Sequence, residues 1–149
     1  MKETETLKLF GRWKLTARHI KTGEVIVKEG KNLIVNVGKY LVCRMLIDEA
    51  TYDVGFTHQA IGRDATPPAV GQAGLIDEAN RLAITTKTRL LNEITMSTFF
   101  TAAQSTYNIK EAGMFGHTAG AIMFSRWLVS FDNSGGLFDL TWDYILTIS

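Results

Sequence analysis

The C-terminal stretch "FDLTWDYILTIS" (138–149) carries the clearest structural pattern in the sequence. Apolar side chains occupy every second position, namely Leu140, Trp142, Tyr144, Leu146 and Ile148. Polar side chains fill most of the positions between them, namely Asp139, Thr141, Asp143 and Thr147. Because successive side chains of a strand point to opposite faces, this alternation predicts a strand with one buried face. Its reach of about 37 Å favours a sandwich wall or an extended ribbon.

The segment before it, "AIMFSRWLVSF" (121–131), is apolar on both alternating faces apart from Arg126 and two serines. This pattern predicts a strand that is central in its sheet or covered on both sides. Between the two segments, "DNSGG" (132–136) contains the residues that favour a chain reversal.

The N-terminal part predicts a β-hairpin. Trp13, Leu15 and Ala17 alternate with polar residues, and "KTGE" (21–24) supplies a glycine turn before the run from Val25 to Val27. Asn32 to Asn36 continues as a short apolar strand or linker.

The sequence indicates one convincing helix. Val37, Leu41 and Met45 recur at four-residue spacing, up to the acidic end at Asp48 and Glu49. Cys43 has apolar neighbours, and we expect it to be a buried small side chain with no disulfide partner.

The middle of the chain predicts further β structure. The expected elements are a strand at 56–62, a loop at 63–74 that contains Pro67 and Pro68, a helical turn from Asp77 to Arg81, and two strands at 81–91 and 93–102 joined near Asn92. Together, the patterns predict a mainly β fold: an antiparallel β-sandwich or barrel-like domain over residues 11–149, with one short α-helix and an N-terminal arm at 1–10.

The composition sets limits on function. The chain has 149 residues, 46% of them hydrophobic, and a formal net charge of +1. This length is usual for one domain, and the charge indicates neither a nucleic-acid partner nor another polyanion. No apolar run approaches the roughly 20 residues of a membrane span, and the N-terminus lacks a signal-peptide core. We therefore expect synthesis in the cytoplasm and no direct nucleic-acid or membrane partner.

The sequence contains no convincing catalytic pattern. His19, His58 and His117 are scattered, without the spacing of a metal site. We interpret Lys110 and Glu111 as part of a surface turn, in which Gly113 allows the next two residues to become buried. The sequence therefore predicts a protein that is not an enzyme, with no catalytic, cofactor-binding or metal-binding residues.

From Ala60 onward, the order of motifs resembles small structural proteins of tailed bacteriophages. These motifs are "AIGRDATPPAVGQAGLIDEANR" (60–81), two Thr-rich strands, "NIKEAGMF" (108–115), "AIMFSRWLVSF" (121–131) and the closing "LTWDYILTIS" (140–149). In that family an EAGLF box precedes a strand with an arginine and a final strand with a Thr-Trp pair. The matching positions here are Glu111 to Phe115, Arg126, and Thr141 with Trp142.

The resemblance implies a β-sandwich-like component of the virion. The leading expectation is a capsid decoration or cement protein that binds and stabilises the head. The alternative is a tail, baseplate or collar-fibre adaptor. The implied partners are the major capsid protein or tail proteins and further copies of the chain, with a trimer as one possible form.

Two expectations concern exposed side chains. An arm bearing Leu7, Leu9 and Phe10, with Trp13 close behind, is the candidate protein interface, since burying it on a neighbour would gain about 25 cal/mol for each Å² of apolar surface. A third function, a carbohydrate-binding β-sandwich, would use Trp13, Trp127 or Trp142 on a strand surface.

Overall fold

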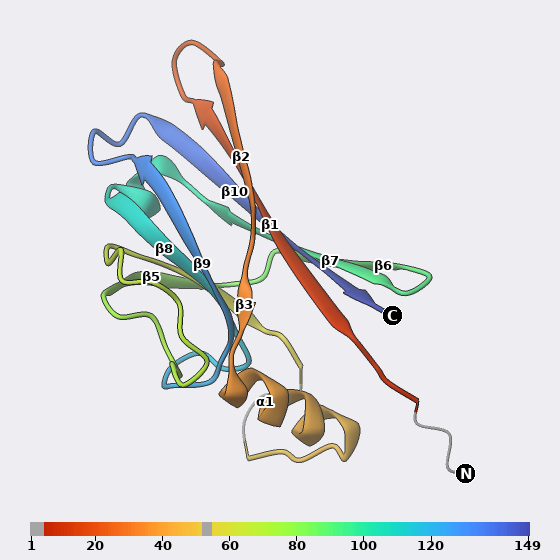
Figure 1. Cartoon of the computed structure of the whole chain (residues 1–149). Coiled ribbons are helices and arrows are strands. Elements are labelled where there is room, and N and C mark those ends of the chain that lie inside the picture. Colours follow the sequence, from red (N-terminus) through yellow and green to blue (C-terminus); the bar gives the residue numbers. More distant parts are fainter. Residues whose placement is uncertain (1–4, 52–54) are drawn as a thin grey trace.

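The strand with the clear alternation lies at the centre of the first of two antiparallel sheets. The structure is a computed structural model that describes residues 5–51 and 55–149. The first sheet, sheet A, has the order β2-β1-β10-β7-β6 (Figure 1). Its strands are β1 (Leu9–His19), β2 (Val25–Lys31), β6 (Thr86–Leu90), β7 (Glu93–Phe100) and β10 (Phe138–Ile148).

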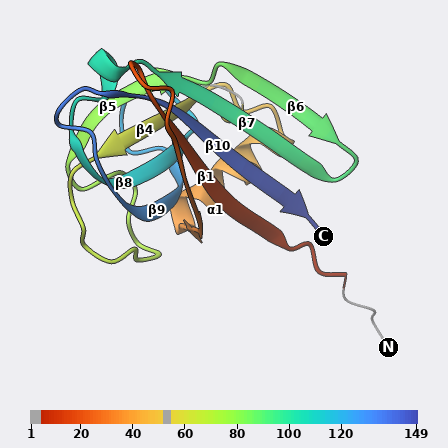
Figure 2. The same cartoon turned by 90° about the horizontal axis from the view of Figure 1, so that it is seen from above.

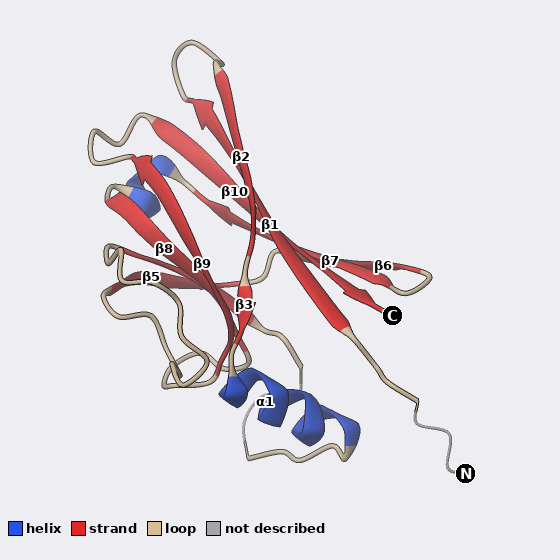
Figure 3. Ribbon diagram, viewed as in Figure 1, coloured by secondary structure: helices blue, strands red, loops and turns tan. Residues whose placement is uncertain are grey.

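The second sheet, sheet B, has the order β3-β9-β8-β4-β5. Its strands are β3 (Leu33–Ile34), β4 (His58–Gly62), β5 (Glu78–Ala83), β8 (Asn108–Phe115) and β9 (Met123–Asp132). The remaining elements are the α-helix α1 (Asn36–Leu46) and the short 3-10 helix η1 (Ala102–Ser105), both coloured blue in Figure 3. Seen from above, β6, β7, β10 and β1 lie side by side in front of sheet B (Figure 2).

Three tryptophans fill the space between the sheets. Trp13 of β1 stacks on Trp127 of β9, with ring centroids 6.2 Å apart, and both rings meet Trp142 of β10 edge-on. Aromatic pairs in these geometries stabilise a core beyond the area that they bury. The core therefore joins β9 of sheet B to the adjacent strands β1 and β10 of sheet A.

The helix α1 packs closely on β9 through Gly38. A Cβ atom at this position would lie 2.2 Å from the carbonyl oxygen of Phe124 and 2.7 Å from its Cα. Only a residue without a side chain allows this approach. The helix covers the end of the space between the sheets and contributes Leu41 to the core.

The structure confirms the mainly β fold with two antiparallel sheets, and among the described residues it contains one α-helix. The expected hairpins at the N-terminus and near Asn92 are present. Because the two sheets have separate edge strands, the arrangement is sandwich-like and does not close into a barrel.

Several expectations from the sequence were wrong. The segment from Asp77 to Arg81 is no helical turn, because β5 begins at Glu78 and pairs with β4. The single strand expected at 81–91 is divided, because the chain passes from β5 in sheet B to β6 in sheet A.

The expected boundary of the N-terminal arm and the expected burial of Cys43 were also wrong. The arm expected at 1–10 overlaps β1, because Leu9 and Phe10 pair with β10, and the Lys8 N–H donates to the Ser149 carbonyl oxygen at 2.7 Å. Residues 1–4 of this arm lie outside the described residues. Cys43 is exposed, because it lies two residues from the buried Leu41 and so about 200° around the helix.

Replacing Gly38 by alanine should destabilise the protein. Alanine normally favours a helix by up to about 1 kcal/mol over glycine. Here the clash with the Phe124 backbone should outweigh that gain and lower the free energy of unfolding by about 1–3 kcal/mol. Urea denaturation measures the difference.

The control is Gly74→Ala, because a Cβ atom at Gly74 meets no atom within 4 Å. This variant should unfold within about 0.5 kcal/mol of the wild type. Equal stability of both variants would show that α1 does not lie this close to β9.

Candidate protein-interaction surface

A buried ion pair joins the two motifs "NIKEAGMF" and "AIMFSRWLVSF". The Arg126 side chain on β9 donates from Nε to Oε2 of Glu111 on β8 at 2.8 Å. Both side chains are 0% exposed. Charges removed from water in this way are costly unless each has partners for all of its hydrogen-bonding atoms.

The loop between β4 and β5 (63–77) supplies these partners. The backbone N–H groups of Ile76 and Asp77 donate to the two carboxylate oxygens of Glu111, at 3.1 and 2.8 Å. The guanidinium of Arg126 donates to the carbonyl oxygens of Thr66 and Asp64. The ion pair therefore holds both ends of the loop against the outer face of sheet B.

Further contacts beside Glu111 and Arg126 also hold the loop at 63–77 against sheet B. Hydrogen bonds from Thr66 hold the pKa of Asp64 below its usual range. Gly113 leaves room for the loop, because a Cβ atom there would lie 3.0 Å from Leu75. Gly113 has no positive φ, so its role is close packing, and the backbone freedom expected from the sequence is not used.

A second charged pair lies beside the first on the outer face of sheet B. Arg81 on β5 lies 2.7 Å from Glu78 and places its guanidinium 3.6 Å from the centre of the Phe115 ring. It also donates to the carbonyl oxygens of His117 and Gly120. The motif residues of 60–81, 108–115 and 121–131 therefore meet in one packed cluster.

This cluster corrects the expectation for Lys110 and Glu111, which lie in the strand β8 and not in a surface turn. The sequence contained one usable signal. Arg126 is the only charged residue in the stretch 121–131, which is apolar apart from two serines, and a buried arginine requires a carboxylate partner. What the sequence did not indicate was which carboxylate it meets.

The four residues of the candidate interface separate in the structure. Leu7 and Phe10 are exposed, and Leu9 is half-buried at the start of β1. Trp13 is 1% exposed and lies in the core, because it shares the inward face of β1 with Leu15 and Ala17. Trp13 is therefore not available at the surface for a partner.

The tryptophans proposed for a sugar site are also in the core. Trp127 and Trp142 are buried against Trp13, so none of the three indoles forms an exposed platform. The inward positions of Trp13 and Trp142 follow from the alternation that predicted their strands, whereas the strand of Trp127 is apolar on both faces and its pattern did not indicate a side.

Leu7 and Leu9 border an apolar groove between α1 and the inner face of sheet A. The groove has a volume of about 410 Å³. The helix contributes Val42, Met45 and Leu46 to it. The other lining residues are Gly55, Phe56, Lys87, Ile94, Met96, Leu146 and Ile148. In Figure 1, this end of sheet A continues past sheet B toward the C-terminus.

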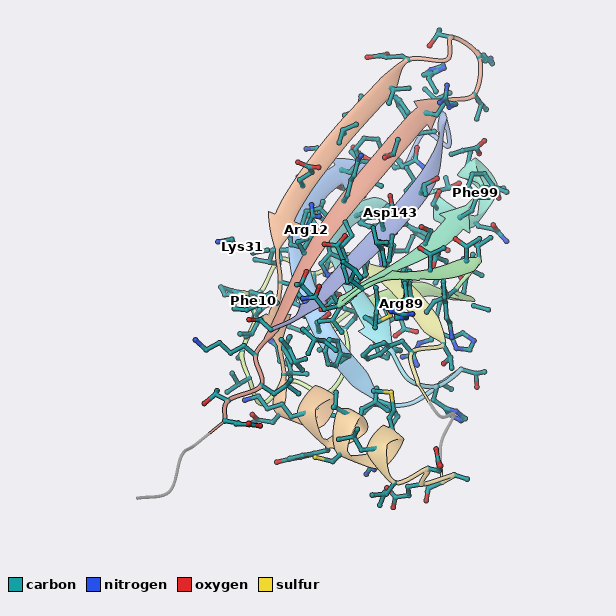
Figure 4. The ribbon with its side chains drawn as sticks, turned by 90° about the vertical axis from the view of Figure 1, so that its right-hand side faces the viewer. Phe10, Arg12, Lys31, Arg89, Phe99 and Asp143 are labelled. Atoms are coloured by element: carbon teal, nitrogen blue, oxygen red, sulfur yellow. The ribbon has the colours of Figure 1, made fainter. Side chains whose placement is uncertain are left out.

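A second cleft lies where the chain leaves sheet A for sheet B. It has a volume of about 610 Å³, and its lining includes Phe10, Arg12, Lys31 and Asn32. Figure 4 shows Phe10, Arg12 and Lys31 along the lower parts of β1 and β2. This cleft is wide and partly polar, whereas the groove beside α1 is almost entirely apolar.

In the described ranges 5–51 and 55–149, no group of three or more His, Cys, Asp or Glu is placed to hold a metal ion. Within the same ranges, no helix has the length and hydropathy needed to cross a membrane. Comparison of the chain with protein families, with curated proteins and with solved structures gives no match.

Replacing Glu111 by glutamine should destabilise the protein strongly. The substitution leaves the buried charge of Arg126 with only the more distant carboxylate of Asp64, at 3.9 Å, and weakens the acceptor for Ile76 and Asp77. Breaking one side of a buried pair typically costs about 3–5 kcal/mol in the free energy of unfolding. Urea denaturation followed by tryptophan fluorescence measures the loss.

The control is Glu93→Gln, because Glu93 and Arg12 form an exposed pair at 3.9 Å. Such pairs contribute at most about 1 kcal/mol. If the two substitutions cost the same, the pair of Glu111 and Arg126 does not hold the loop as described.

Proposed function

We propose that the protein is a non-enzymatic structural component of a tailed-bacteriophage particle that acts by binding neighbouring protein subunits. The leading form of this proposal is a decoration or cement protein that stabilises the head. The alternative is a tail, baseplate or collar-fibre adaptor. Both forms require the same property, an apolar surface that a partner can cover.

The observation that carries the proposal is the groove beside α1 together with its exposed rim. Leu7 and Leu46 are largely exposed at the groove, and Ile47 follows Leu46 at the end of α1. Leu90 and Leu91 are exposed at the tip of the hairpin whose Lys87 and Ile94 line the groove. Covering one such side chain contributes about 1.5–3 kcal/mol. A soluble monomer gains nothing from several large apolar side chains gathered at one end, whereas a subunit of an assembly does.

The resemblance to phage structural proteins provides separate support. Its motif residues, including Gly62, Leu75, Glu111 and Arg126, are used in packing the loop at 63–77 onto sheet B. In this role they build a rigid scaffold and leave binding to other surfaces. A buried structural role for Glu111 and Arg126 is compatible with a protein that acts by binding other proteins.

The location of the chain in particles tests the proposal. Particles of the phage that encodes the chain should contain it, and a labelled copy should lie on the head by electron microscopy. Particles made without it should release DNA at a lower temperature. A label on the tail would favour the adaptor, and purified particles that lack the chain would contradict both forms.

Incorporation of variants tests the surface. Leu46→Ser removes an exposed side chain from the groove, and we expect it to reduce the copies per particle. Val27→Ser, an exposed position on β2 at the opposite edge of sheet A, serves as the control and should incorporate normally. Equal incorporation of both variants would show that the groove is not the contact.

A further inference from the structure

The hairpin between β6 and β7 ends in two exposed leucines. Leu90 is 75% exposed and Leu91 is 79% exposed. Leu91 begins the two-residue turn and has a φ of 52°. Positive φ at the first position of such a turn favours glycine or asparagine, and a leucine there costs folding free energy. A bulky apolar residue at this position is therefore unfavourable both for the backbone and for solvation.

This tip lies beside the apolar groove. The groove is lined by Lys87 on one strand of the hairpin and by Ile94 on the other. Ile94 follows Leu91 by three residues, so the tip extends about 10 Å beyond the groove wall. A protruding apolar element and a receiving apolar groove are thus neighbours on one hairpin.

We propose that the occupant of this groove is the Leu90–Leu91 tip of a second copy of the chain, in a two-fold dimer in which each copy inserts its tip into the other. The inference rests on the proposed function as a protein-binding subunit, and it names the partner of the same surface.

The tip and one wall of the groove lie on the same hairpin, so each copy in a dimer can both insert a tip and receive one. A two-fold axis brings the same patch of both subunits together, so both tips and both grooves are used in one contact. A closed ring would more easily join a tip and a groove that lie on opposite sides of the subunit. Their proximity therefore favours a dimer over the trimer considered from the sequence.

The charges around the groove complement each other across such a contact. The hairpin wall carries Lys87 and Arg89, and Arg89, labelled in Figure 4, pairs with the groove residue Ile94. At the opposite wall, the end of α1 is followed by the exposed Asp48 and by Glu49, which already pairs with Arg44 at 3.1 Å. When the hairpin of one copy enters the groove of the other, its Lys87 and Arg89 can approach Asp48 at the far wall, which favours this orientation of the two copies.

Sedimentation velocity of the full chain measures the association directly. We expect the wild type to form a dimer within a range of about 1–100 µM. The double variant L90S/L91G should raise the dissociation constant about 100-fold, because the dimer contains two tips and each tip loses both leucines. The matched control is V25S/V27S, which removes two exposed apolar side chains from β2, and it should dimerise like the wild type.

A second measurement separates association from folding. Because glycine suits the positive φ at position 91, Leu91→Gly should unfold at the same or a higher urea concentration than the wild type, measured at a protein concentration at which both are monomers. Loss of the dimer with retained stability supports the inference.

Four results would overturn it: a wild type that stays monomeric through the range, a dimer that L90S/L91G leaves intact, a dimer that the β2 control disrupts equally, or a trimer or larger ring. None of them affects the location of the chain in phage particles, because that experiment detects the protein whatever its own oligomeric state. Failure of this inference is thus distinguishable from failure of the proposed function.

Discussion

The buried ion pair between Glu111 and Arg126 is the contact on which the arrangement of the whole molecule depends. Neither side chain reaches water, so each requires a full set of partners, and the backbone of the loop at 63–77 provides the remaining ones. The loop cannot leave sheet B without breaking the hydrogen bonds that Ile76 and Asp77 donate to Glu111 and those that Arg126 donates to Thr66 and Asp64. It therefore acts as a fixed layer of the protein, although it contains no regular secondary structure.

This layer determines which surfaces remain available. The loop covers the outer face of sheet B, and the tryptophans join the inner faces of both sheets. The outer face of sheet A carries charged and hydroxyl side chains such as Lys14, Thr141 and Asp143. Where sheet A continues past sheet B, α1 covers only part of the end, and Leu7, Leu46 and Leu91 are among the exposed apolar side chains there. The inferred binding surface is thus a consequence of how far the two sheets overlap.

The sequence predicted the elements in which a local pattern alone decides the structure. The alternation in β10, the four-residue spacing in α1 and the glycine turn between β1 and β2 all depend on near neighbours. Residues with a role set by distant contacts were misread. Glu111 was assigned to a surface turn because its partner Arg126 lies on another strand, and β5 was read as a helical turn because only pairing with β4 makes it a strand. Of the candidate interface residues, Leu7 and Phe10 are exposed as expected, whereas Trp13 is buried by the alternation of its own strand.

We propose that other subunits cover the end of the molecule formed by α1 and the β6–β7 hairpin. Hydrogen–deuterium exchange, compared between the chain in dilute solution and the chain in its assembled state, tests this proposal. We expect slower exchange on assembly at residues 41–47 and 86–94, and unchanged exchange at the β1–β2 turn (20–24). Protection confined to the β1–β2 turn, or no change at 41–47 and 86–94 in a verified assembly, would contradict it.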